Sequence, residues 1–142
     1  MEIHKGFKID SPDLFINWGI KKADFISLFP ESKLKKVTGD YYTAECISLG
    51  GLSCNIGFHF DGNIWGKKLK ELEFFRNDYS NQRQSFYEFQ KYFETAFGQP
   101  TTTTQGTEGF PNHNWNLESG VQIVHYIFDR FGPEEHMRIR KI

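Results

Sequence analysis

The chain has 142 residues, which corresponds to one domain of ordinary size, and its 17 basic and 18 acidic residues give a net charge of −1. It contains 15 Phe, 6 Tyr and 3 Trp but only 8 Leu and 3 Ala. Coiled coils and helical bundles need heptads rich in Leu and Ala, so the composition excludes them. The many aromatic side chains argue against disorder, and the lack of a basic excess argues against a dedicated nucleic-acid binder.

The sequence also bears on the compartment. No stretch has the ~18 consecutive apolar residues of a membrane helix, and residues 1–6 lack the apolar run of a secretory signal. We therefore expect a cytoplasmic location. Cys46 and Cys54 flank Gly50-Gly51, which is typical of a two-residue hairpin turn. That register puts the two thiols on opposite faces of the sheet, so we expect free thiols rather than a disulfide.

The N-terminal region is predicted to contain one extended segment and two helices. Residues 1–10 alternate weakly between apolar and polar side chains, which indicates an extended segment. Ser11-Pro12 is a helix-start signal, because Ser can cap the first turn and Pro fits the first helical position. This signal predicts a short helix over Pro12–Asn17. A second helix is predicted over Lys21–Phe29, which the following proline ends.

The next region has the pattern of a β-hairpin. Strands are predicted over Tyr41–Leu49 and Leu52–Phe60, joined by the Gly50-Gly51 turn, with a third strand over Leu69–Arg76. Alternation divides the first two strands into two faces. The apolar face comprises Ile47, Leu49, Leu52, Cys54, Ile56, Phe58 and Phe60. The polar face comprises Cys46, Ser48, Ser53, Asn55, Gly57, His59 and Asp61. This separation predicts a half-buried antiparallel sheet.

The second half of the chain is predicted to repeat this pattern of a helix followed by strands. Ser85 and Glu88 fit a capping box that begins a helix, and its apolar stripe runs to Phe97, before Gly98. Residues 101–109 have the composition of a polar loop. Three further strands are predicted, over His113–Leu117, Val121–Phe128 and His136–Ile142.

Together these elements predict an α+β fold, with an antiparallel sheet of about six strands and helices packed on one face, in a single domain over residues 1–142. Residues 20–76 and 85–142 follow the same order of elements. A spacing of 68 residues separates both Phe25 from Phe93 and Leu49 from Leu117. Duplication of a helix-plus-hairpin unit would explain this spacing. The alternative is that such units recur by chance, because few residues are identical.

The chain has none of the spacings that carry common chemistry. Its five histidines and two cysteines show no zinc-binding pattern, and no nucleophile elbow, phosphate loop or dinucleotide fingerprint is present. Cys46 and His59 share the predicted polar face and could supply a thiolate and a base, but no acid is assigned to orient the base. We therefore predict no catalytic residues, no metal and no cofactor.

The predicted polar face offers candidate residues for binding a partner. Asn55, His59 and Asp61 lie on it. Trp65 follows Ile64 in a glycine-flanked connection between two strands, where apolar residues either fold back as a plug or contact a partner. We take Asn55, His59, Asp61 and Trp65 as the candidate partner-binding residues.

The plan of the chain, with Ile16-Asn17-Trp18-Gly19 and Phe93-x-x-x-Phe97-Gly98-x-Pro100, resembles the immunity proteins of bacterial toxin systems, of the contact-dependent inhibition and polymorphic toxin types. It is also similar to the two-repeat architecture of the beta-lactamase inhibitor proteins. The resemblance implies a non-catalytic protein that neutralises a cognate toxin domain by binding it. The alternatives are a small nucleic-acid or ligand-binding module that uses the polar face, and a hydrolase that uses Cys46 and His59. The oligomeric state stays open.

Overall fold

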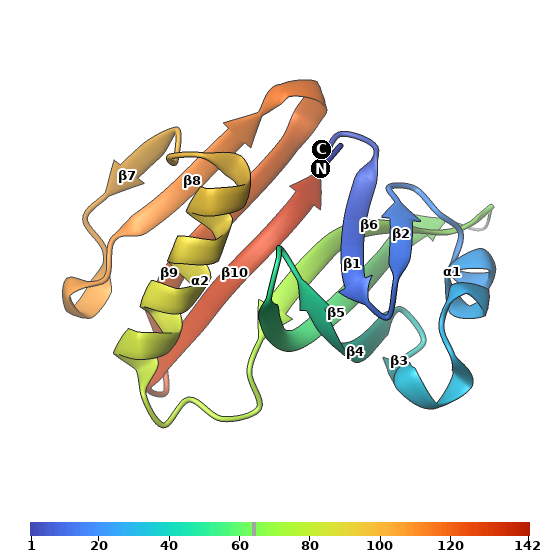
Figure 1. Ribbon diagram of the computed structural model, residues 1–142, viewed down its shortest axis with the longest axis horizontal. Coiled ribbons are helices and arrows are strands. Elements are labelled where there is room, and N and C mark those ends of the chain that lie inside the picture. Colours follow the sequence, from blue (N-terminus) through green and yellow to red (C-terminus); the bar gives the residue numbers. More distant parts are fainter. Residues whose placement is uncertain (64) are drawn as a thin grey trace.

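The computed structural model describes residues 1–63 and 65–142, and over these residues it has an open, antiparallel, ten-stranded sheet and two α-helices (Figure 1). The strands are β1 (Gly6–Ser11), β2 (Leu14–Asn17), β3 (Lys35–Thr38), β4 (Tyr41–Ser48), β5 (Leu52–Asn63), β6 (Gly66–Phe75), β7 (Thr102–Thr104), β8 (Asn112–Leu117), β9 (Val121–Asp129) and β10 (Pro133–Lys141). The helices are α1 (Lys22–Leu28) and α2 (Gln82–Phe97), with three short 3-10 turns, η1 (Glu31–Lys33), η2 (Thr107–Gly109) and η3 (Glu118–Gly120). Ile64, in the connection between β5 and β6, lies outside the described residues.

The strand order is β2-β1-β4-β5-β6-β10-β9-β8-β7, and β3 also pairs with β4. The predicted α+β class and the antiparallel sheet are confirmed. The sheet is larger than the expected six or so strands, because the N-terminal segment, residues 35–38 and residues 102–104 also form strands. The prediction of a polar loop over residues 101–109 is therefore wrong at Thr102–Thr104, which form β7 and pair with β8.

The N-terminal segment forms a hairpin instead of a helix. β1 and β2 pair from Gly6 with Asn17 to Ile9 with Leu14, so the predicted helix over Pro12–Asn17 is wrong. Phe7, Ile9 and Ile16 are buried, and Ile9 also pairs with Ser48 of β4. Strand pairing and burial with a period of two therefore outweigh the local helix-start signal.

The hairpin between β4 and β5 forms, but in a register shifted by one residue. Leu49 and Gly50 occupy the turn with φ of 53° and 78°, and the Gly51 N–H donates to the Ser48 carbonyl at 3.1 Å. Cys46 consequently lies directly opposite Cys54, and the prediction that the two residues point to opposite faces is wrong. Both cysteines are free and buried. A one-residue slip moves every side chain of a strand to the other face.

The shifted register inverts the predicted faces of β4 but keeps those of β5. Tyr42, Ala44, Cys46 and Ser48 are buried, whereas Ile47 is 41 % exposed. The predicted polar position of Cys46 and Ser48 and the predicted inward position of Ile47 are therefore wrong. Leu52, Cys54, Ile56, Phe58 and Phe60 point into the core as expected.

The helices predicted over Lys21–Phe29 and from Ser85 to Phe97 are confirmed as α1 and α2, but the start of α2 was predicted wrongly. Helix α2 begins at Gln82, where the Asn81 side chain accepts a hydrogen bond from the Gln84 N–H at 3.0 Å. The predicted capping box at Ser85 is wrong, because the Ser85 hydroxyl donates to the buried Glu135 carboxylate at 2.7 Å. The helix ends at Gly98, as predicted, with φ of 82°.

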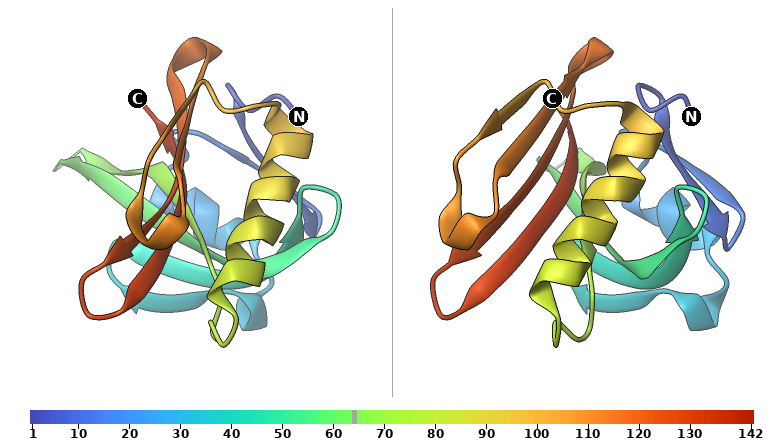
Figure 2. Two further views of the ribbon diagram at one scale, coloured as in Figure 1. Left: turned by 90° about the vertical axis from the view of Figure 1, so that its left-hand side faces the viewer. Right: turned by 60° about the vertical axis from the view of Figure 1, so that its left-hand side comes forward.

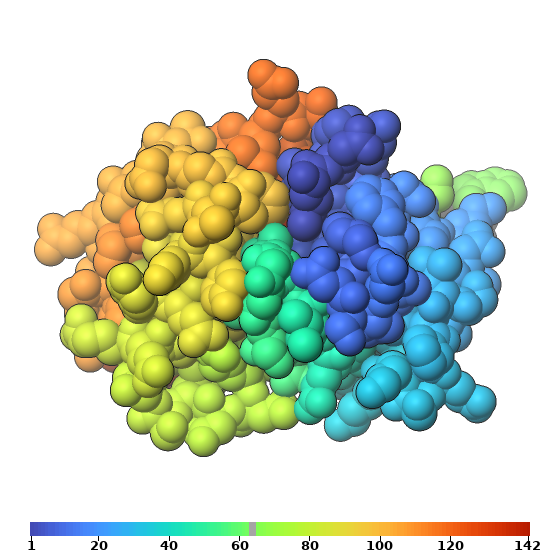
Figure 3. Space-filling model, viewed as in Figure 1, coloured from blue at the N-terminus to red at the C-terminus, as the bar shows by residue number. Residues whose placement is uncertain are grey.

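The helices and the N-terminal hairpin cover the same face of the sheet, and the core lies beneath them (Figure 2). Phe25 of α1 packs on Phe58 at a ring distance of 4.8 Å. Phe74 of β6 contacts Phe7 of β1 at 5.4 Å and Phe93 of α2 at 5.1 Å. On this side, Figure 3 shows the α2 region, the β4–β5 turn and the N-terminal hairpin packed next to one another. The expectation that the helices share one face is confirmed by these contacts.

The two halves of the chain have the same order of elements. Helix α1 is followed by β3, β4, β5 and β6, and α2 is followed by β7, β8, β9 and β10. The two sets of strands meet where β6 pairs with β10, from Phe74 with Met137 to Glu71 with Arg140. This order is what a duplication predicts, and duplication itself stays a prediction. Within the described ranges, no helix has the length and the apolar character needed to cross a membrane.

Candidate functional site

The face of the sheet opposite the helices, here called the outer face, gathers large polar and aromatic side chains. It is formed by the alternate residues of each strand whose neighbours fill the core. In the central strands these residues are Tyr41, Thr43, Glu45, Asn55, His59, Glu71, Glu73, Tyr126, His136, Arg138 and Arg140. Among the described residues, neither α-helix covers this face, so its side chains are the candidate functional surface.

Tyr41 and His59 form one end of a connected row on the outer face. They lie opposite each other on β4 and β5, and their rings stack with centroids 4.3 Å apart and planes 25° apart. The Tyr41 ring also covers the backbone of Gly57, where a Cβ atom would lie 2.5 Å from the tyrosine hydroxyl oxygen. The sequence therefore needs glycine at this position for the ring to lie flat on the strand.

Glu73 of β6 connects the two rings to the next strand. Its Oε2 accepts hydrogen bonds from the Tyr41 hydroxyl at 3.2 Å and from His59 Nε2 at 3.0 Å, and its Oε1 accepts one from Arg138 at 3.2 Å. The hydrogen bond from His59, together with the Arg138 charge, lowers the pKa of Glu73 against the opposing effect of burial. Burial and the Glu73 charge raise the pKa of Tyr41. The carboxylate is therefore held ionised beside a neutral phenol.

Arg138 of β10 lies at the centre of the row. Its guanidinium donates to Glu71 at 3.3 Å as well as to Glu73, and Arg140 donates to the other oxygen of Glu71. Two arginines thus face two glutamates, and the centre of the outer face is balanced in charge. The Arg138 Nε atom is buried and has no hydrogen-bond partner among the residues that the structure describes.

His136 and Tyr126 form the other end of the row. Their rings stack at 4.8 Å with an interplanar angle of 10°, and His136 Nδ1 lies 3.4 Å from the Arg138 guanidinium. Burial and the nearby Arg138 charge lower the pKa of His136. We call the connected set the platform; it comprises Tyr41, His59, Glu73, Arg138, His136 and Tyr126. The platform crosses β4, β5, β6, β10 and β9.

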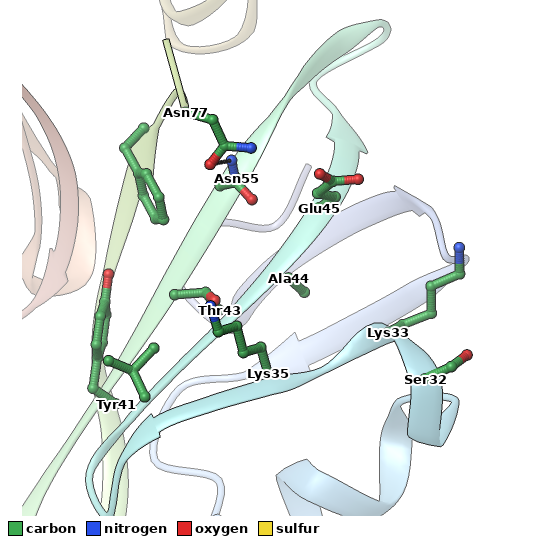
Figure 4. Close-up of a pocket in the computed structure, with 11 residues that line it drawn as sticks. Ser32, Lys33, Lys35, Tyr41, Thr43, Ala44, Glu45, Asn55 and Asn77 are labelled. Carbon is green, nitrogen blue, oxygen red and sulfur yellow. Dashed lines mark hydrogen bonds between the residues drawn. The ribbon is translucent and has the colours of Figure 1, made fainter.

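A groove of about 560 Å³ adjoins the Tyr41 end of the platform (Figure 4). Lys33 and Lys35 lie on one side of it, and Asn55 and Asn77 lie on the other. The Asn55 side-chain amide donates to the Asn77 side-chain oxygen at 3.0 Å. The groove is within the size range of about 300–1,000 Å³ that is typical of ligand sites.

The four predicted partner-binding residues occupy different parts of this surface. His59 belongs to the platform, and Asn55 belongs to the groove. Asp61 is exposed further along β5, where its carboxylate accepts a hydrogen bond from the Gly62 N–H. Trp65, in the β5–β6 connection, is 82 % exposed. The structure therefore brings Asn55 and His59 onto the outer face. Asp61 and Trp65 lie further along, where the β5–β6 hairpin turns.

Five of the six platform residues were missed by reasoning from the sequence. Tyr41, Glu73, Tyr126, His136 and Arg138 come from four strands, and no local motif links them. The available signal was alternation in β10, where buried residues separate His136, Arg138 and Arg140. That alternation indicates a polar strand face but does not say which strands lie beside it.

The arrangement proposed for a hydrolase does not form. Cys46 points into the core, whereas His59 lies on the outer face, so the sheet separates the two side chains. Burial also raises the pKa of the Cys46 thiol to about 12, which disfavours a thiolate. Over the described ranges, no group of three or more His, Cys, Asp or Glu residues is placed to hold a metal ion.

Comparisons with known proteins identified no relative of this chain. No protein-family model matches the chain, and the searches of curated proteins and of solved structures gave no match.

Proposed function

We propose that the chain is a non-catalytic binding protein that neutralises a cognate toxin by covering it with the outer face. The observation that carries the proposal is the platform, a row of six large side chains that hold one another in place across five strands. Tyr and Arg are enriched among the residues that dominate protein–protein binding energy. The outer face therefore has the composition of a protein interface.

The order of the platform lowers the cost of binding. Immobilising a flexible side chain at an interface costs about 0.5–1.5 kcal/mol. Here Tyr41 and His59 are fixed by stacking, by Glu73 and by the contact with Gly57, and Arg138 is fixed by two carboxylates. These side chains are thus arranged before a partner arrives, which supports rigid recognition of a folded protein.

The same contacts argue against the nucleic-acid alternative. Phosphate binding needs unbalanced positive charge, whereas Glu71 and Glu73 neutralise Arg138 and Arg140. Bases need open aromatic faces on which to stack, whereas a histidine already occupies one face of the Tyr41 ring and one face of the Tyr126 ring. A toxin partner would also agree with the resemblance to immunity proteins. The proposal implies a cytoplasmic location, where free thiols such as Cys46 and Cys54 stay reduced.

The test uses the product of the gene directly upstream of this one in its genome as the candidate toxin. That product should arrest growth when it is expressed alone, and co-expression with this protein should restore growth and give a stable complex on size exclusion. Tyr126→Ala should weaken the complex by about ten-fold or more. Tyr87→Ala is the matched control, because Tyr87 is an exposed tyrosine on α2, on the opposite side of the sheet.

Two results would overturn the proposal. One is a neighbouring gene product that is not toxic and does not bind. The other is a complex that tolerates Tyr126→Ala and Tyr41→Ala as well as it tolerates Tyr87→Ala, because binding would then use another surface. Tight retention of single-stranded DNA in a filter-binding assay at low salt would favour the nucleic-acid alternative.

A further inference from the structure

The groove next to Tyr41 has a chemical character that identifies one kind of occupant. It lies on the outer face over β4, and it is bordered by η1 and β3 on one side and by β5, the end of β6 and Asn77 on the other (Figure 4). Its surface offers three different features, namely two exposed lysines, a pair of side-chain amides and two aromatic rings. Each feature limits what can bind.

The lysines favour a negatively charged group. The side chains of Lys33 and Lys35 are exposed and line the groove, and they make no hydrogen bond or ion pair with any residue that the structure describes. By contrast, Lys22 and Lys67, which do not line the groove, have a carboxylate partner in Asp40. Glu45, the acidic residue that lines the groove, also lacks a partner among the described residues. Two cations and one anion leave the groove with an excess positive charge, so it complements an acidic group.

The paired amides favour a peptide backbone. Asn55 and Asn77 share one hydrogen bond between their side chains, which leaves one amide NH₂ group and one amide oxygen unused on the groove side. An extended peptide presents an N–H and a C=O of matching polarity at neighbouring positions. The pair can therefore hold one peptide unit through both of its polar groups.

The rings favour an apolar side chain. Tyr41 and Phe75 line the groove at the end nearest the platform, and the hydrogen bond to Glu73 fixes Tyr41. In Figure 4 Lys33 lies on the side of the groove away from Tyr41, and Lys35 lies between them, beside its strand partner Thr43. An occupant that reaches both ends must carry an apolar group at one end and a negative charge at the other.

We propose that the groove binds an extended, acidic segment of the partner protein, with an apolar side chain against Tyr41 and Phe75 and a carboxylate beside Lys33 and Lys35. This inference rests on the proposed function, because it assumes that the occupant belongs to a protein. It adds a second contact area to the platform and defines the chemistry of the partner at this point.

The direct test uses a synthetic peptide and the full chain. The probe is a blocked hexapeptide with one phenylalanine and two aspartates, and the matched probe replaces both aspartates with lysine. The acidic peptide should shift the NMR signals of the Asn55 and Asn77 side-chain amides at millimolar concentration, whereas the basic peptide should not. Absence of any shift with the acidic peptide would overturn the inference.

A charge-reversal pair separates groove binding from general attraction to a basic surface. Lys35→Glu should weaken the acidic peptide by about ten-fold. Lys36→Glu changes the net charge by the same amount. Lys36 is next to Lys35 on β3 but does not line the groove, so this variant should bind the acidic peptide with an affinity within about two-fold of that of the wild type. Equal weakening by both substitutions would contradict the inference. Lys33→Glu, in η1, repeats the test if Lys35→Glu does not fold.

The two proposals can fail separately. If the upstream gene product forms a complex that is sensitive to Tyr126→Ala but not to Lys35→Glu, the groove inference fails and the proposed function stands. If the peptide binds as expected but no neighbouring protein is toxic, the groove inference stands and the toxin partner is wrong. Shifts of the same amide signals by single-stranded DNA, stronger than those caused by the acidic peptide, would overturn the peptide assignment.

Discussion

The ring of Tyr41 lies on the backbone of Gly57, on the neighbouring strand. An atom at the Cβ position of Gly57 would be 2.5 Å from the Tyr41 hydroxyl oxygen and 2.6 Å from its Cε1 atom. Real side chains do not approach so closely, so any larger residue must displace the ring. The position of Tyr41 on the platform therefore depends on a residue that has no side chain.

Gly57→Ala should destabilise the protein by about 1–3 kcal/mol, because the added methyl group forces Tyr41 out of its contacts with His59 and Glu73. Urea denaturation measures this change. In the Tyr41→Ala background the same substitution should cost much less, since the clash is removed. Gly39→Ala is the control, because a Cβ there meets no atom within 4 Å. Equal effects of Gly57→Ala in both backgrounds would contradict the assigned contact.

A buried histidine–glutamate pair fixes α2 to the sheet. His125 Nε2 lies 2.6 Å from Glu135 Oε2, and both side chains are fully buried. Glu135 also accepts hydrogen bonds from Ser85 at 2.7 Å and from Gln82 at 3.1 Å, both on α2. Glu135→Ala should therefore lower the free energy of unfolding by about 3–5 kcal/mol, because three donors lose their buried acceptor.

Two variants check this prediction by urea denaturation. Glu135→Gln keeps an oxygen acceptor and most of the side-chain volume, so it should cost less than Glu135→Ala. Glu134→Ala removes the neighbouring carboxylate, which is partly exposed and lies 3.6 Å from His136. This substitution should lower the free energy of unfolding by at most about 1 kcal/mol. If Glu135→Ala is as mild as Glu134→Ala, the buried network does not stabilise the contact between α2 and the sheet.

Stability should fall as the solution becomes acidic, in two steps. Burial lowers the pKa values of His113, His125 and His136 below the ordinary value of 6.5. The unfolded chain then binds protons that the folded chain does not, so stability is lost as the pH falls below about 6.5. The pKa of Glu73 is also lowered, from 4.5, and its contribution is present above that pH and lost as the pH falls further.

Urea midpoints measured between pH 8 and pH 4 check this expectation. The midpoint should be nearly constant above about pH 7, decline towards pH 5 and decline again below about pH 4.5. His136→Asn removes one of the three histidines and should reduce the first decline. A midpoint that rises between pH 7 and pH 5 would show that the histidines are stabilised in their charged form.

The two cysteines should react slowly in the folded protein. They face each other across β4 and β5, and burial raises the pKa of each thiol to about 12. Because the thiolate is the reactive form, iodoacetamide at pH 8 should modify neither residue at the rate of an exposed thiol, and unfolding in urea should make both reactive. Mass spectrometry of timed samples measures the two rates. Rapid labelling of Cys46 without denaturant would contradict its burial in the core.

Local patterns in the sequence identify the helices and strands whose apolar residues all lie on one face. The alternation from Leu52 to Phe60 predicts β5 and its buried face, and the apolar stripe from Phe86 to Phe97 predicts α2 and its end at Gly98. These signals are reliable because each strand or helix must bury one face regardless of its neighbour. They also led to two of the surface residues that lie in the platform and the groove, His59 and Asn55.

The fold beyond these elements depends on contacts between distant segments. The helix-start signal at Ser11-Pro12 is outweighed by pairing of β1 with β2 and β4, and the threonines of β7 form a strand because β8 lies beside them. A pattern with a period of two predicts strands but does not select their partners. The size of the sheet is therefore a tertiary property.

The sequence alone was enough to predict the antiparallel α+β class. It also predicted β5, α2 and the three strands β8, β9 and β10. The tertiary structure decided the register and the site. Leu49 takes a positive φ in the turn, which shifts β4 by one residue and turns Cys46 inward and Tyr41 outward. Arg138 then meets Glu73, 65 residues away, because β6 and β10 are neighbours. Turn conformation and strand pairing set these relationships, and neither is encoded by the alternation of side chains within one strand.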